Sequence, residues 1–272
     1  MGCAIVTRVK RPSRLAVALA IAAAAATAAA AAGCGPKASG APAAAGAPAA
    51  AGAATPAAGA RATAGAATPA ASVRAAAAVK PEQLALMVLP RDLLAGGRFD
   101  ALQPSSSSGE MTIDDATRYT LDPKDGADTI VDAGWVAGHD RSWGPGFAPD
   151  GVFFGGTTVQ LFDGEPTAAL YHARQIESFR QFRGRVIEGG WTLRSTESWR
   201  VPALGADAWA LRNVFRSKAG TFYDTEVHLR VGAVVGEVGI ISSRDTNLRR
   251  AIETDGRALL LRIKRVAGSA KQ

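Results

Sequence analysis

The sequence predicts an α+β domain in which a mainly antiparallel sheet is covered by two longer helices. Apolar and polar residues alternate with period two through residues 209–231, and a continuous apolar run follows at 234–241. Apolar residues recur every three or four positions through 166–183 and again through 246–266. Period two is typical of strands, and spacings of three and four are typical of helices. We therefore expect a C-terminal three-stranded meander with one covered face and one face in water.

The second strand of this meander divides its residues cleanly between the two faces. Tyr223, Thr225, Val227, Leu229 and Val231 alternate with a polar set. Side chains at successive strand positions point to opposite faces of a sheet. The polar set is therefore expected on the water face, and it comprises Asp224, Glu226, His228 and Arg230.

Each of the two longer helices is expected to present one stripe to the sheet. In 166–183, Pro166 suits the first turn. In 246–266, Gly256 falls within the stripe and would let the helix approach the sheet closely. The two stripes are Ala169, Ala173, Ile176 and Phe179 in the first helix, and Leu248, Ile252, Leu259, Ile263 and Val266 in the last, which we expect to be capped near Asp245 or Thr246.

Shorter elements are expected before the first long helix, where Gly and Pro interrupt the chain often. They are a helix from Pro81 to Pro90, a mostly irregular stretch over 91–122 with a helix near 114–118, a helix over 126–133 capped by Asp125, and strands over 135–142 and 152–162 on either side of a Gly/Pro loop.

Residues 1–33 have the three parts of an export signal. Basic residues from Arg8 to Arg14 precede the apolar run Leu15–Ala32, and small residues follow. The sequence Ala31-Ala32-Gly33-Cys34 resembles the lipobox of bacterial lipoproteins, although Ala31 stands where that family most often has Leu. The resemblance implies that the thiol of Cys34 receives a diacylglyceryl group and that a peptidase cuts before it. Ordinary cleavage with secretion is the alternative, and retention as a membrane span is disfavoured because the run is short and rich in Ala.

Residues 34–80 predict a disordered linker, and residues 81–272 a single folded domain. The linker consists mostly of Ala, Gly, Pro and Thr, without an acidic or aromatic residue. Such a segment cannot bury enough surface to offset its ordering entropy. Its prolines also interrupt any run long enough to nucleate a helix.

Charge and cysteine usage restrict what the domain could bind. Eight basic residues and no acidic residue precede position 81, so the domain itself carries 23 basic against 24 acidic residues. Nucleic-acid binding depends on cations that neutralise phosphates, so no nucleic-acid partner is expected. Both cysteines, Cys3 and Cys34, precede the domain, which excludes structural disulfides and a thiol nucleophile within it.

Candidate site residues are few. His139 and Asp140 are the one adjacent His and acid, and they are the basis for a hydrolase alternative. The other histidines, His172 and His228, share no metal-ligand spacing with His139, so no metal and no cofactor are expected. The sequence contains no Gly-x-Ser-x-Gly nucleophile elbow.

Aromatic residues concentrate between positions 135 and 209, and core packing accounts for most of them. Trp143 and Phe147 flank Pro145 in a Gly-rich loop where no periodic pattern would bury them. We interpret these two, together with Trp135, as candidate ligand-binding residues.

The lipid-attachment cysteine, the Ala/Pro/Thr linker and the cysteine-free α+β domain together resemble small actinobacterial-type lipoproteins with a PsbP-like α/β/α sandwich. The resemblance covers element order over roughly 120–266. It implies an extracytoplasmic binding or accessory role and brings no catalytic residue with it.

The function expected from the sequence is a non-enzymatic lipoprotein, anchored by lipid to the outer face of the cytoplasmic membrane or to another cell-envelope membrane. Its domain would bind a small hydrophobic ligand or an envelope protein. The alternatives are an extracytoplasmic hydrolase that uses His139 and Asp140, and a structural envelope protein with no specific ligand. The oligomeric state is left open.

Overall fold

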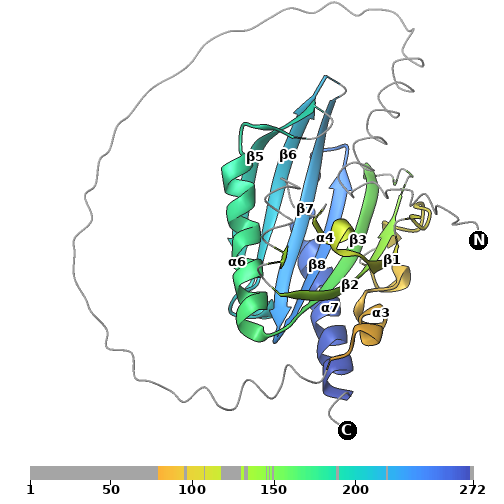
Figure 1. The fold of residues 1–272 in the computed structure, drawn as a ribbon. Helices are drawn as coiled ribbons and strands as arrows, with labels where there is room; N and C mark the ends of the chain where they lie inside the picture. Colours follow the sequence, from red (N-terminus) through yellow and green to blue (C-terminus); the bar gives the residue numbers. More distant parts are fainter. Residues whose placement is uncertain are drawn as a thin grey trace, which may run out of the picture.

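The computed structural model describes residues 79–94, 97–106, 108–117, 130–131, 134–144, 146, 148, 150–187, 190–218 and 220–269 (Figure 1). The expected leader, Cys34 and nearly all of the linker lie outside the described residues, as does most of the helix expected at 126–133. Within the described ranges, no helix is both long and apolar enough to cross a membrane.

One eight-stranded antiparallel sheet dominates the domain, in the order β1-β2-β3-β8-β7-β6-β5-β4. The expectation of a three-stranded meander covered by two long helices is therefore wrong. The expected meander supplies only three central strands of a much larger sheet. The strands are β1 (Gly109–Met111), β2 (Trp135–Trp143), β3 (Val152–Phe162), β4 (Val186–Ile187), β5 (Trp191–Arg200), β6 (Trp209–Ser217), β7 (Gly220–Val231) and β8 (Val234–Ser242).

The sheet is assembled from two meanders that meet in its centre. The first meander is β1-β2-β3, and the second is β4-β5-β6-β7-β8. Helix α6 (Glu165–Phe182) follows β3 and leads to β4 at the far edge of the sheet. The second meander then returns across the sheet until β8 pairs with β3, with Thr158 opposite Glu237. Residues far apart in sequence are thereby joined in the middle of the sheet.

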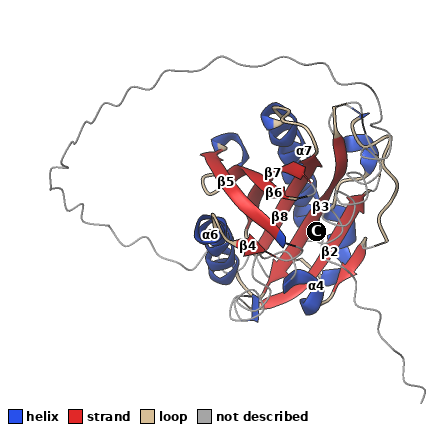
Figure 2. Cartoon of the chain, turned by 90° about the horizontal axis from the view of Figure 1, so that it is seen from above, coloured by secondary structure: helices blue, strands red, loops and turns tan. Residues whose placement is uncertain are grey.

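Helices cover both faces of this sheet, so neither central face is in water (Figure 2). Helix α7 (Arg249–Ser269) packs on β7 and β8, and α6 packs on the other side. Every residue of β3 and of β8 is buried. The expectation of one wet face is wrong for this reason, and we refer below to the α7 face and the α6 face of the sheet.

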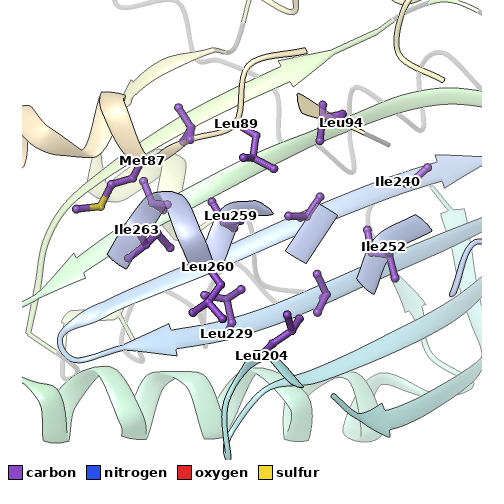
Figure 3. Packing of buried hydrophobic residues seen from close by; sticks show 14 of the residues in the cluster. Met87, Leu89, Leu94, Leu204, Leu229, Ile240, Ile252, Leu259, Leu260 and Ile263 are labelled. Atoms are coloured by element: carbon purple, nitrogen blue, oxygen red, sulfur yellow. The ribbon is translucent and has the colours of Figure 1, made fainter. Parts of the chain in front are cut away.

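The α7 face is filled by aliphatic side chains. Ile252, Leu259 and Ile263 of α7 lie over Leu229 and Ile240 of the sheet (Figure 3). The close approach expected at Gly256 is confirmed, because a Cβ there would lie 2.8 Å from side-chain atoms of both Leu204 and Val227. Helix α7 begins at Arg249, slightly later than expected. The side chain that accepts a hydrogen bond from the backbone N–H of Arg249, at 3.1 Å, is that of Asn247 rather than that of Asp245 or Thr246.

Several short helical elements border the sheet, and those at the start of the domain extend the α7 layer. Met87 and Leu89 extend the aliphatic core beside α7 (Figure 3). The helix expected after Pro81 is confirmed as a 3-10 turn followed by a short α-helix. These shorter elements are η1 (Pro81–Gln83), α3 (Leu84–Met87), η2 (Arg91–Leu93), α4 (Ile113–Thr117) and η5 (Pro202–Leu204).

Helix α6 turns a different stripe inward from the one its apolar residues predict. Phe179 is buried as expected, but Ala173 is exposed. The inward stripe is instead partly polar and comprises Ala168, Tyr171, His172, Gln175 and Phe179. The helix is rotated so that hydrogen-bonding side chains, rather than small apolar ones, meet the sheet.

Candidate functional site

The most unusual feature of the domain is a buried polar network between α6 and the centre of the sheet. Asp224, Glu226 and His228 alternate along β7 and all point to the α6 face. His228 is only 1% exposed. Glu237 of β8 lies directly opposite His228 in the register and is also buried. Buried charged groups are costly unless they are paired and hydrogen-bonded, so their partners decide what this network can do.

His228 is held by contacts on both ring nitrogens and on its face. Its Nε2 lies 2.9 Å from Oε2 of Glu226, and its Nδ1 lies 3.2 Å from Oε1 of Gln175. The Oε2 atom of Glu237 is 3.9 Å from the same Nδ1. The imidazole stacks on the indole of Trp209, with ring centroids 4.0 Å apart and planes 14° apart. The imidazole ring is therefore surrounded by contacts from four elements, α6, β6, β7 and β8.

Gln175 continues the network toward β3. Its Nε2 donates to the hydroxyl of Tyr171 at 2.8 Å, and Nε2 of Gln160 donates to the same hydroxyl at 3.1 Å. Burial raises the pKa of Tyr171 far above its usual value of 10.0. The phenol therefore stays protonated at physiological pH and acts as a neutral hydrogen-bonding group.

Asp224 continues the network in the other direction, toward β5. Burial, the nearby carboxylate of Glu226 and a hydrogen bond with that group raise the pKa of Asp224 well above its usual value. Asn213 donates to Asp224 at 3.5 Å and accepts from Thr196 at 2.9 Å. The carboxyl group of Asp224 therefore retains a proton more readily than an isolated carboxylate does.

Polar atoms without partners border this network. Nε2 of His172 and Nε1 of Trp209 are buried without a hydrogen bond, and their rings lie 5.6 Å apart. Oε1 of Gln160 is also buried without a partner. Burial above all, with positive charge at His228 and Arg230, lowers the pKa of His172 to about 3. His172 is therefore neutral, and with the proton on its other ring nitrogen, Nε2 offers a lone pair.

Arg230 ties the start of α6 to the sheet beside the network. Its guanidinium donates to Glu165 at 2.9 Å and to Asp207 at 2.5 Å. It also donates to the carbonyl of Gly232 at 3.2 Å. Because the Arg230 side chain is mostly buried, this clamp fixes the N-terminal end of α6 over β7.

The structure separates the two residues of the expected hydrolase pair. His139 and Asp140 are successive residues of β2, so their side chains point to opposite faces. Asp140 is buried on the α6 face, where it accepts hydrogen bonds from Ser142 at 3.0 Å and from Thr158 at 3.1 Å. Burial, followed by the charge of Arg141, lowers the pKa of His139. The pair cannot act as a dyad in this arrangement.

The three expected ligand-binding aromatic residues do not form one site in the described residues. Trp143 is 4% exposed and packs edge-on against Phe99, with ring centroids 5.7 Å apart. Trp135 is partly buried at the start of β2, against a separate apolar cluster, and its Nε1 has no partner. Phe147 lies outside the described residues. Trp143 therefore has a packing role, and a ligand role for these residues stays a prediction.

The network under α6 was missed because its residues were assigned to a water face. A usable signal was present, since Tyr171, His172 and Gln175 form a polar stripe on the long helix, and Asp224, Glu226 and His228 form one on a strand. Two polar stripes that face each other form an internal network. Among the residues the structure describes, no three His, Cys, Asp or Glu side chains are placed to hold a metal ion.

No protein family model matches this chain, and no curated protein matches its sequence. Among solved structures, the chain is similar to the extracellular domain of PknH from Mycobacterium tuberculosis, with 12% sequence identity and a TM-score of 0.44. That similarity covers 71% of this chain and 97% of the other. At this level of similarity neither a family nor a function transfers, so the function has to be argued from the residues themselves.

Proposed function

We propose that the protein is an exported lipoprotein, anchored through Cys34, whose domain binds a ligand or partner outside the cytoplasm without catalysing a reaction. The N-terminal sequence supports the first part, because basic residues, an apolar run and small residues precede the cysteine in the order that export requires. A diacylglyceryl group supplies two acyl chains, which is enough for stable anchoring. The resemblance to PsbP-like lipoproteins implies the same kind of role.

Mass spectrometry of the mature N-terminus tests the anchor. We expect the protein to begin at Cys34 with an acylated thiol and to fractionate with membranes. Cys34→Ser should leave the protein unacylated and release it from the anchor. Cys3→Ser is the matched control, since Cys3 lies in the segment that is removed. A mature protein that begins elsewhere, or carries no acyl chain, contradicts the anchor.

The binding role rests on one observation, the unpaired buried atoms at the α6 contact. Trp209 Nε1 is a donor, and neutral His172 Nε2 is an acceptor. A hydroxyl group can accept from the first and donate to the second. Buried polar groups usually have a partner, so the chemistry of this pair calls for a hydroxyl from a bound ligand or from water.

Native mass spectrometry of the mature protein distinguishes the two sources of that hydroxyl. A ligand appears as a retained mass that is lost in Trp209→Phe, which keeps the ring and removes the donor. Trp199→Phe is the matched control, because it makes the same substitution on the α7 side, where the Nε1 of Trp199 donates to Glu253. A protein with no retained mass, or one whose retained mass is indifferent to Trp209→Phe, contradicts a ligand at this site.

A further inference from the structure

Helix α7 carries a continuous basic stripe on the side that faces away from the sheet. Arg250, Arg257, Lys264 and Arg265 are all exposed, and Leu261 lies among them with 59% of its surface exposed. At about 100° of rotation per residue, these five positions fall within roughly one third of the helix circumference. The opposite side of α7 bears the buried aliphatic stripe, so the basic residues form a surface of their own.

No acid of α7 neutralises this basic stripe. Glu253 is engaged by Arg249 Nε at 3.2 Å and by Trp199 Nε1 at 2.9 Å. The other acid of α7, Asp255, is completely buried and is not part of the exposed surface. Helix α7 thus carries six basic residues against two acidic ones, whereas the domain as a whole is nearly neutral. Concentrated exposed cations attract surfaces that carry phosphate groups.

The linker joins the domain beside the same stripe. Val79 packs against the aliphatic core, and η1 and α3 follow at once in the sequence. Arg262 Nε donates to the carbonyl of Leu86, which places α3 against the C-terminal half of α7 (Figure 1). Leu86 is itself 56% exposed. The chain that leads back to Cys34 therefore joins the domain beside the C-terminal half of α7, which carries Leu261, Lys264 and Arg265.

We propose that the basic stripe of α7, with Leu261 and Leu86, docks on the anionic phospholipid surface of the membrane that carries the anchor. The phosphate of an anionic headgroup attracts Lys and Arg within about a Debye length of the surface. Exposed leucines beside such cations enter the interface between headgroups and acyl chains. The anchor raises the effective concentration of the domain at that surface, so weak docking suffices. The biological setting rests on the proposed anchoring, but the surface affinity does not.

Vesicle flotation of the unlipidated mature chain tests the docking separately from the anchor. The chain begins at residue 34 and carries Cys34→Ser, so any binding comes from the folded surface. The vesicles contain equal parts phosphatidylglycerol and phosphatidylcholine, or phosphatidylcholine alone. We expect binding to the anionic vesicles only, weakened by added salt. The triple variant Arg250→Glu/Arg257→Glu/Lys264→Glu should lose at least about tenfold in vesicle affinity.

The matched control reverses three exposed cations on the opposite side of the domain. Arg174→Glu/Arg180→Glu/Arg183→Glu changes the net charge equally but alters α6 and its C-terminal end. This control should keep most of the vesicle binding. Leu261→Ser, which preserves every charge, should weaken binding without abolishing it. Thermal unfolding confirms that each variant is folded, and Leu261→Ser remains a test if the triple variant is not.

Three results would overturn the docking proposal. They are equal loss of binding in both triple variants, equal binding to neutral and anionic vesicles, and binding to a soluble polyanion such as heparin without binding to vesicles. If the native protein is acylated but the Cys34→Ser chain does not bind vesicles, docking alone is contradicted. If the native protein is not acylated but the Cys34→Ser chain binds vesicles through α7, the anchor alone is contradicted.

Discussion

The two faces of the sheet are each covered by one long helix, yet they are built from different chemistry. Beneath α7 lie aliphatic side chains such as Leu229 and Ile240. Beneath α6 lies a hydrogen-bonded network centred on His228, beside an aromatic cluster that contains Phe215 and Phe222. Burial of apolar surface stabilises the fold without directional requirements. A buried polar network stabilises it only if nearly every group is satisfied.

This difference assigns separate roles to the two layers. The α7 layer supplies stability, because most of its contacts join aliphatic side chains, although it also buries Asp255. The α6 layer holds positioned polar atoms at a cost in stability, and the unpaired ones include atoms of Gln160, His172 and Trp209. Natural proteins depart from an apolar interior mainly at functional sites. The α6 layer is therefore where ligand-dependent behaviour should be sought.

The largest effect is expected from Trp143→Ala on the α7 side of the sheet. Trp143 belongs to the main aliphatic cluster and contacts Phe99, so its removal leaves a large cavity. We expect a loss of about 4 kcal/mol in the free energy of unfolding, measured by denaturant titration. Trp143→Phe fills most of the space and should cost much less. Near-native stability together with loss of a bound ligand would instead show that Trp143 lines a binding site.

A smaller but still large effect is expected from His228→Phe on the α6 side. Phenylalanine keeps the stacking on Trp209 but leaves Glu226 and Glu237 without the imidazole. Removing one partner from a buried charged group costs about 3 kcal/mol or more. Adding Glu226→Gln removes one of the stranded charges and should restore part of the loss. If the double variant is no more stable than His228→Phe, the network does not depend on charge.

The contrast between the faces also explains what the sequence could predict. Strands β2, β3 and β8 and helices α6 and α7 occur within a few residues of the expected positions, because periodicity and turn residues are local signals. The pairing of β3 with β8 joins residues about 80 positions apart and has no local signal. Local signals alone therefore predict that the α6 face of β7 is exposed and that its acidic residues are solvated.

Strand β5 was missed for a related reason. Its inward positions Trp191 and Leu193 are apolar, but most of the rest of the strand is exposed or half-buried. It lies near the edge of the sheet, where only part of each face is covered. Likewise, helix α6 appeared amphipathic through Ala173 and Ile176, whereas the polar stripe of β7 selects Tyr171, His172 and Gln175 as its partners. The partner surface, rather than the helix itself, decides which stripe turns inward.

The pH dependence of stability tests the α6 layer further, since it contains groups with strongly shifted pKa values on facing elements, His172 on α6 and Asp224 on β7. The pKa of His172 is about 3 in the folded protein and 6.5 in the unfolded chain. The unfolded chain therefore binds the proton first, and stability falls as the pH drops below 6.5. Between about pH 7.5 and pH 5 the loss from His172 is about 2 kcal/mol.

The raised pKa of Asp224 changes stability with pH in the opposite direction, so the contribution of His172 has to be isolated. The variant His172→Asn does this, because it removes the imidazole and keeps Asp224. A carboxyl group with a raised pKa contributes stability in acid that is lost as the pH rises through its folded pKa. We therefore compare the free energy of unfolding of the wild-type protein with that of His172→Asn, by denaturant titration at each pH. The wild-type protein should lose about 2 kcal/mol relative to the variant between about pH 7.5 and pH 5. A difference that is constant with pH would mean that His172 is solvated.

The smallest effect is expected on the outer side of α6, and it tests what holds the helix in place. Glu177 and Arg180 form an exposed ion pair within the helix, 3.5 Å apart. Glu177→Gln should cost less than about 0.5 kcal/mol, because exposed pairs are well solvated. Glu165 binds the mostly buried Arg230, so Glu165→Gln should cost about 1 kcal/mol on the same denaturant assay. If the two substitutions lower the free energy of unfolding equally, the Arg230 clamp does not fix α6. Nothing would then hold His172 Nε2 and Trp209 Nε1 in the arrangement that the proposed ligand requires.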